Sequence, residues 1–171
     1  MNLVEALTRE HSKAQCLKIV RFVGDNPRRF ERLLRVFLEG PYRITQRAAW
    51  PLNYCVEAHP ALIQPHLKKI LLNVKKPGLP DAVKRNTLRL LQFVDIPPSL
   101  RGLVVVICFD FFQSKKEPVA VKVFSMTVLA NVAQDLKELR QELILRIEDQ
   151  LPYGSAGFLS RAGRVLKQLK A

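Results

Sequence analysis

The chain has 171 residues, of which 48% are hydrophobic and 25% are charged, so it can bury an apolar core and is not expected to be disordered. Its 28 Lys and Arg residues outnumber its 15 Asp and Glu residues, and the formal net charge of +13 favours an acidic partner or surface. The longest unbroken apolar stretch, Leu103 to Phe109, is far shorter than the roughly 20 residues that cross a bilayer, so we expect no membrane insertion.

The amino terminus and the cysteines bear on the cellular compartment. The first residues include Glu5 and lack the basic start, apolar block and small-residue cleavage site of a secretory signal. Cys16, Cys55 and Cys108 are odd in number and widely spaced, which argues against a disulfide framework and against a CxxC metal or redox pair. We therefore expect a cytoplasmic protein.

Most of the chain carries apolar residues at helical spacing. Between Arg28 and Leu38 the apolar side chains follow the i, i+3, i+4, i+7 pattern of an amphipathic helix, and Gly40-Pro41 ends that helix. A helix is also expected from Leu62 to Val74, with Pro65 in its opening turn. The apolar residues of the first of these helices are Phe30, Leu33, Leu34, Phe37 and Leu38.

Helices are also predicted from Ser99 to Phe112 and from Asp135 to Leu151. The first contains Val104 to Ile107, a β-branched run with strand propensity, which we interpret as helical because its neighbours are helical. A last helix, from Ser155 to Lys170, has Ser155 as its candidate N-cap. Pro51 is expected to kink the helix that contains it.

The chain repeats itself. Two segments, Pro80 to Lys84 and Pro118 to Lys122, align without gaps 38 residues apart, and each opens a helix. Extended along the chain, this frame places one basic residue early in each of five helices, at spacings of 34, 38, 37 and 39 residues. These residues are Lys13, Arg47, Arg85, Lys122 and Arg161. Other helices lie between them, so the sequence predicts about five helical hairpins.

The repeated segments resemble the HEAT-repeat family, in which an acidic residue, a valine and a basic residue open the second helix of each hairpin. The residues that carry the resemblance are Pro80 to Arg85 with Leu88, Leu90 and Leu91, and, more loosely, Glu117 to Leu129 and Gln46 to Trp50. Nearly the whole chain is similar to this family, including small uncharacterised bacterial HEAT-like proteins. The resemblance implies an all-α fold: a right-handed α-solenoid of about five antiparallel helical hairpins, forming a single domain over residues 1–171.

In HEAT solenoids the second helix of each hairpin usually lines the concave wall, so the resemblance implies a row of basic side chains there. We call this set the basic ladder: Arg47, Arg85, Lys122 and Arg161, joined by Arg43, Lys84, Arg89 and Arg164. Such residues can hold phosphates or carboxylates through charge-assisted hydrogen bonds. They can also pair within the repeats, as the i, i+4 spacing of Asp81 and Arg85 indicates. Residues 58–116 hold ten basic and three acidic residues, so some basic surface stays unpaired.

Trp50, the single tryptophan, follows Arg47 by three residues. An exposed ring could stack on a nucleobase or an aromatic ligand, whereas a buried ring would fill space between hairpins. A more distant resemblance, to the HEAT-like DNA alkylation repair glycosylases, bears on this residue, because their catalytic aspartate follows a tryptophan by four residues. Here that position is Tyr54, so the sequence predicts no glycosylase activity.

No other pattern points to catalysis. The three histidines fit neither HExxH nor a Cys/His zinc spacing, and no GxSxG elbow or phosphate-cradling GxxxxGK[ST] loop occurs. We therefore expect no enzyme activity, no cofactor and no metal. Pro152 to Phe158 is a glycine-containing turn before the last helix, and Tyr42 and Tyr153, each directly after a proline, are interpreted as residues of the repeat junctions.

The sequence favours a non-enzymatic helical-repeat scaffold or adaptor that binds an acidic protein or peptide through its basic groove. The alternative is a DNA- or RNA-binding protein that contacts phosphates with the basic ladder and lacks glycosylase activity. A continuous basic groove would favour nucleic acid. Basic residues scattered over both walls would favour contacts with proteins.

Overall fold

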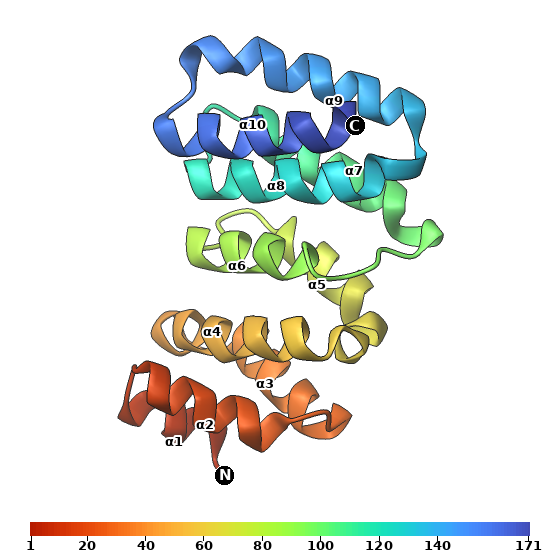
Figure 1. Cartoon of the computed structure of the whole chain (residues 1–171). Helices are drawn as coiled ribbons and strands as arrows, with labels where there is room; N and C mark the ends of the chain where they lie inside the picture. Colours follow the sequence, from red (N-terminus) through yellow and green to blue (C-terminus); the bar gives the residue numbers. More distant parts are fainter. The chain divides into compact units, whose positions relative to one another are not determined.

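The computed structural model describes all 171 residues, and it contains ten α-helices and no β-strand (Figure 1). The all-α class and the helical hairpins of an α-solenoid are therefore confirmed. The helices are α1 (Leu3–Arg9), α2 (Lys13–Val23), α3 (Pro27–Glu39), α4 (Tyr42–Ala58), α5 (Leu67–Val74), α6 (Asp81–Leu91), α7 (Pro98–Gln113), α8 (Val119–Val132), α9 (Lys137–Gln150) and α10 (Ala156–Lys170). Four short 3-10 helices join them: η1 (Pro60–Leu62), η2 (Gln64–His66), η3 (Ala133–Asp135) and η4 (Leu151–Tyr153).

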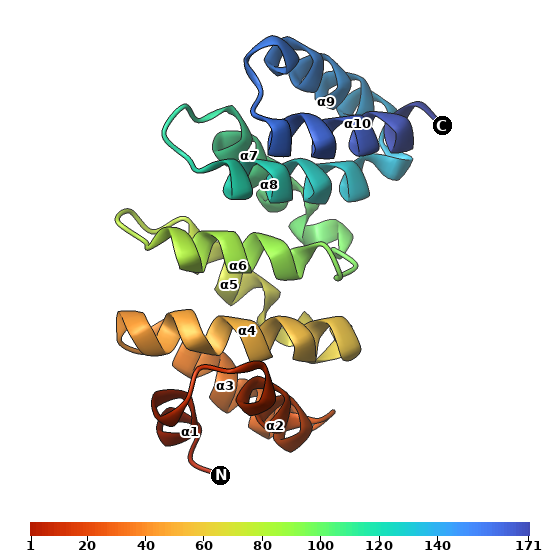
Figure 2. The same cartoon turned by 60° about the vertical axis from the view of Figure 1, so that its left-hand side comes forward.

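The chain divides into two compact units, Met1–Asp95 and Ile96–Ala171. Successive helices pack against each other as five pairs, from α1 with α2 to α9 with α10, as the repeat frame predicts. In the first unit α4 lies between α2 and α6, and in the second α8 packs against both α7 and α10 (Figures 1 and 2). The expected single domain over residues 1–171 and the right-handed turn of the stack stay predictions.

The apolar face of α3 is buried in the core of the first unit. Phe30, Leu33, Leu34 and Phe37 are at most 1% exposed, which places the predicted apolar stripe against α4. At the start of α3, the Asn26 side chain accepts the Arg29 backbone N–H at 3.0 Å. Gly40 follows the last turn, so both boundaries agree with the sequence to within a residue.

Two proline positions have different consequences. α4 continues for 17 residues through Pro51, which lies buried inside it. The helix expected from Leu62 to Val74 is shorter than predicted, because residues 60–66 form two 3-10 turns and α5 begins only at Leu67. Pro65 explains this difference, since it lacks an N–H donor and disfavours α-helical geometry in the residue before it.

The second unit confirms the helical interpretation of its β-branched run. Val104 and Ile107 are buried on α7, where they follow the helical rather than the alternating pattern. The start expected for α9 at Asp135 is two residues too early, because that residue ends η3. Ser155 caps α10 as predicted, its hydroxyl accepting the Phe158 backbone N–H at 3.4 Å. None of the ten helices is both long and apolar enough to cross a membrane.

Candidate functional site

The principal residues of the basic ladder all lie on the second helices of their pairs. Arg47 is on α4, Arg85 on α6, Lys122 on α8 and Arg161 on α10, as the repeat spacing predicts. Their surroundings nevertheless differ. Arg47 and Arg161 form hydrogen bonds inside their own units, whereas the side chains of Arg85 and Lys122 form none.

Arg47 and Arg161 each reach back to an earlier helix pair. Arg47 is half-buried, and its Nη1 donates to the carbonyl oxygens of Leu7 and Thr8, at 2.9 Å each. Arg161 donates from Nη1 to Thr127 Oγ1 at 2.8 Å, and desolvation, followed by the charge of Arg164, lowers its pKa. These contacts give both arginines a structural role in the packing of the repeats.

The ion pair expected between Asp81 and Arg85 does not form. Asp81 pairs with Lys84, their charged atoms 3.3 Å apart, and not with Arg85. The carboxylate therefore pairs with the i, i+3 neighbour, and Arg85 is exposed and has no ion pair. Arg164 donates only to the carbonyl oxygen of Ser160 on its own helix, at 3.5 Å, and Arg43 is exposed at the start of α4.

Arg85 and Arg89 are the two ladder residues that come together at a hollow surface. They lie one helical turn apart on α6, both exposed, and neither side chain forms a hydrogen bond or an ion pair. With Trp50 of α4 they line a depression of about 240 Å³. The rest of its lining is His11, Gln46, Ala49 and Asn86. We call this feature the Trp50 depression.

Trp50 forms one side of the depression and is half-buried, between the two alternatives that the sequence left open. Its ring meets His11 edge-on, with the centroids 5.6 Å apart and the planes at 63°. The Asn86 side chain is fixed by a hydrogen bond within α6, from its Nδ2 to the Ala82 carbonyl oxygen at 2.7 Å. The aromatic wall therefore has fixed neighbours, whereas the arginines beside it are free to turn toward a ligand.

The electrostatics of the Trp50 depression follow from its lining. No acidic side chain lines it, so the charges of Arg85 and Arg89 are not neutralised locally. A carboxylate or phosphate there could accept hydrogen bonds from both guanidinium groups, and an apolar group could rest on the indole. His11 and Gln46 were not predicted as site residues, because only the packing of α4 beside α6 and the α1–α2 linker brings them together.

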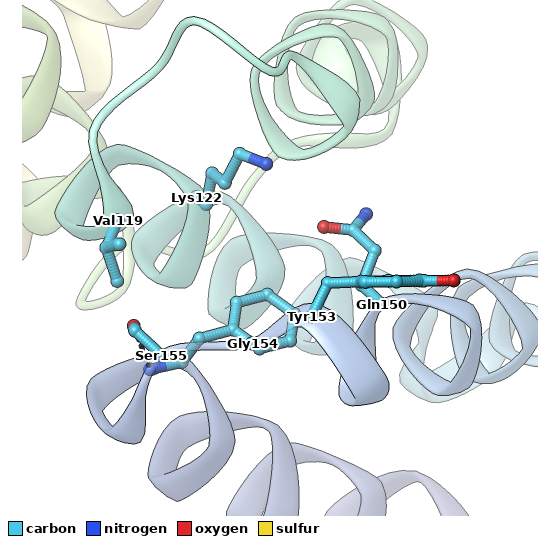
Figure 3. A pocket seen from close by; sticks show the side chains of 7 residues that line it. Val119, Lys122, Gln150, Tyr153, Gly154 and Ser155 are labelled. Atoms are coloured by element: carbon cyan, nitrogen blue, oxygen red, sulfur yellow. Dashed lines mark hydrogen bonds between the residues drawn. The ribbon is translucent and has the colours of Figure 1, made fainter.

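Lys122 lines a different, smaller pocket of about 140 Å³ in the second unit (Figure 3). It is half-buried and has no hydrogen bond or ion pair. Tyr153 lies at the same pocket and is 89% exposed, and Tyr42 in the first unit is 58% exposed. Both tyrosines lie beside turns between paired helices, Tyr42 at the start of α4 and Tyr153 at the end of η4, and both are exposed there.

Comparison with known proteins agrees with this architecture. A family profile described as a HEAT repeat domain matches residues 3–169, nearly the whole chain. No curated protein and no solved structure is significantly similar to it. The finer likenesses, to small bacterial HEAT-like proteins and to the DNA alkylation repair glycosylases, stay predictions.

Proposed function

The chain belongs to the HEAT repeat family, whose members commonly serve as protein-interaction scaffolds, and on that premise we propose that it is a non-enzymatic adaptor for an acidic partner. The partner binds through an acidic segment of its chain. The binding surface is the Trp50 depression, with Arg85 and Arg89 as the residues that receive the carboxylates. The expected cytoplasmic location belongs to the same proposal.

One observation carries this proposal. Two exposed arginines without partners stand beside a partly exposed aromatic ring, and no acid lines the space between them. Arginine and tryptophan are the residue types that most often dominate binding energies at protein interfaces. The net charge of +13 adds long-range attraction, which speeds the encounter with an acidic partner.

Nucleic acid is the second candidate, and Trp50 is the observation that favours it. A partly exposed indole beside two arginines can stack on a base of a single strand while the arginines contact phosphates. This surface contains no carboxylate that could serve excision of a base. The second candidate is therefore binding alone, without glycosylase activity.

Fluorescence titration separates the two candidates. Because Trp50 is the single tryptophan, its emission reports on the depression directly. The probes are a short Asp/Glu-rich peptide containing one leucine and a single-stranded oligonucleotide of the same charge. We expect the peptide to change Trp50 emission and to bind more tightly than the oligonucleotide. Tighter binding of the oligonucleotide would refute the adaptor proposal and support the nucleic-acid function.

The decisive variant is Arg85→Ala with Arg89→Ala. We expect this double variant to lower the affinity for the peptide by about tenfold or more, which corresponds to about 1.4 kcal/mol of binding free energy. The matched control is Arg28→Ala with Arg32→Ala, which removes the same charge at the same i, i+4 spacing from exposed positions on α3. An equal loss in both variants would reduce the effect to net charge and would refute a site at the depression.

A further inference from the structure

A second surface of unusual composition lies in the unit formed by residues 96–171. It surrounds the 140 Å³ pocket between the start of α8 and the η4 turn that precedes α10 (Figure 3). We call it the Tyr153 patch and define it by Val119, Lys122, Tyr153 and Leu159. It shares no residue with the Trp50 depression.

The apolar members of the patch are exposed, and two of them, Val119 and Tyr153, line one pocket. Val119 is 43% exposed, Leu159 42% and Tyr153 89%. Leu159 lies close to Gly154, where a Cβ would be 3.1 Å from Leu159 Cδ2, and Val119 lies close to Gly157, where a Cβ would be 4.0 Å from Val119 Cγ1. Single exposed apolar residues are ordinary, but Val119 and Tyr153 at one hollow, with Leu159 next to Gly154 of its lining, indicate an interaction surface.

The Tyr153 side chain is exposed and has no hydrogen bond or ring contact. Tyr153 ends η4, directly after Pro152. Phe158, which lines the same pocket, is buried and stacks on Phe112 with the ring centroids 6.2 Å apart. Tyrosine is enriched at protein interfaces and among the residues that dominate their binding energy, so an exposed tyrosine at a pocket lined by a buried phenylalanine fits a binding surface.

The polar members of the pocket set the charge of its occupant. Lys122, from α8, and Gln150, from the end of α9, both line the pocket, and in Figure 3 their polar ends point away from the Gly154–Ser155 turn. Lys122 has no ion pair, and no acidic side chain lines the pocket. The pocket is too small for a cofactor or other drug-sized ligand, which typically needs about 300 Å³ or more.

We propose that the Tyr153 patch binds a short segment of a partner protein in which an apolar side chain stands next to a carboxylate. The apolar side chain enters the pocket against Phe158 and contacts Tyr153 and Val119, with Leu159 next to Gly154 at its edge. The carboxylate pairs with Lys122. A second copy of this chain is a poor occupant, since two molecules of charge +13 repel each other.

The probe for this proposal is a labelled peptide that carries a Leu-Glu pair between glycine and serine spacers, titrated by anisotropy and by amide chemical shifts. Two companion peptides replace the leucine by alanine or the glutamate by lysine. We expect the Leu-Glu peptide alone to bind, with shifts centred on Tyr153, Phe158 and Lys122 and with no change in Trp50 emission. Binding by none of the peptides, or equal binding by all three, would overturn the proposal.

Matched variants locate the site. Tyr153→Ala is expected to weaken the Leu-Glu peptide about tenfold or more, whereas Tyr42→Ala, an exposed tyrosine also placed directly after a proline, is expected to leave it unchanged. Lys122→Gln is expected to remove the preference for glutamate over lysine, and the exposed Lys167→Gln is its control. Equal effects of the two tyrosine variants, or self-association of the chain that depends on Tyr153, would overturn the assigned occupant.

This outcome is independent of the Trp50 depression. Arg85→Ala with Arg89→Ala should leave the Leu-Glu titration intact, and Tyr153→Ala should leave the change in Trp50 emission by the acidic peptide intact. Either surface can therefore fail without the other. If one variant abolished both signals without unfolding the protein, the proposal of a separate patch would be wrong.

Discussion

Arg47 on α4 donates from Nη1 to the carbonyl oxygen of Leu7, 40 residues earlier in the chain, at 2.9 Å. The same nitrogen donates to the Thr8 carbonyl oxygen, also at 2.9 Å. Both carbonyls belong to the last turn of α1, where no intrahelical N–H is left to satisfy them and where the helix dipole is negative. Arg47, which the sequence predicted as a ligand contact, therefore holds α1 against α4 of the next helix pair.

Replacement of Arg47 by Leu should therefore lower stability. We expect the free energy of unfolding to fall by about 1–2 kcal/mol, because the hydrogen bonds of a charged donor to a part-buried and an exposed carbonyl oxygen are lost. Urea unfolding followed by circular dichroism measures it, and Arg32→Leu at an exposed position of α3 without an ion pair is the control. Equal stability of the two variants would show that the contact with α1 contributes nothing.

Arg85 and Arg89 should behave in the opposite way. Both side chains are exposed and have no partner, so their replacement by alanine should change the free energy of unfolding by less than about 0.5 kcal/mol. The same urea experiment applies. A large loss of stability in this double variant would mean that its effect on binding cannot be assigned to direct contact with a ligand.

The contrast between these arginines shows where prediction from sequence ends. The repeat spacing placed Arg47, Arg85 and Arg161 correctly on second helices, because helical period and proline positions are local signals. What each guanidinium contacts depends on residues 34 to 40 positions away, and no spacing rule contains that. The same limit applies to the Trp50 depression, whose lining comes from three separate segments.

Local chemistry accounts for the smaller differences too. The N-cap at Ser155 was predictable from one residue type, whereas the choice of Asp81 between Lys84 and Arg85 depended on side-chain placement. The 3-10 turns before α5 follow from Pro65, yet the sequence pattern alone allowed that proline in the opening turn of a longer helix. Apolar spacing therefore predicted the helices better than their first residues.

Glycines inside and at the ends of helices should respond differently to alanine. Gly163 lies within α10, and a Cβ there would meet no atom within 4 Å, so Gly163→Ala should stabilise the protein by about 0.5–1 kcal/mol. Gly40, which follows α3, should not tolerate the change, because a Cβ there would lie 2.5 Å from the backbone oxygen of Val36. Thermal unfolding of the pair checks both signs. A stabilising Gly40→Ala would show that the end of α3 can shift without cost.

The buried thiols should make the protein less stable in alkaline solution. Desolvation raises the pKa of Cys16 to about 11, and desolvation together with the nearby Cys16 raises that of Cys55 to about 12, both above the ordinary value of 9.0. Between pH 9 and these values the unfolded chain releases thiol protons that the folded protein keeps. Ionisation then favours the unfolded chain, so the free energy of unfolding should fall as the pH rises through this range.

Lysine and tyrosine side chains also titrate in this range, so the thiol contribution has to be isolated by a variant. Urea unfolding at pH 8 and at pH 10 should show a smaller alkaline loss for Cys55→Ala than for the unsubstituted protein, even though the variant starts from lower stability because a buried side chain is truncated. Reaction with a thiol reagent at pH 8 gives an independent measure. All three buried cysteines should react slowly in the folded protein and rapidly in urea, since the thiolate is the nucleophile and burial suppresses it. Rapid labelling of Cys55 in the folded protein, or an identical alkaline loss in Cys55→Ala, would place this thiol in contact with water and contradict the packing of α4.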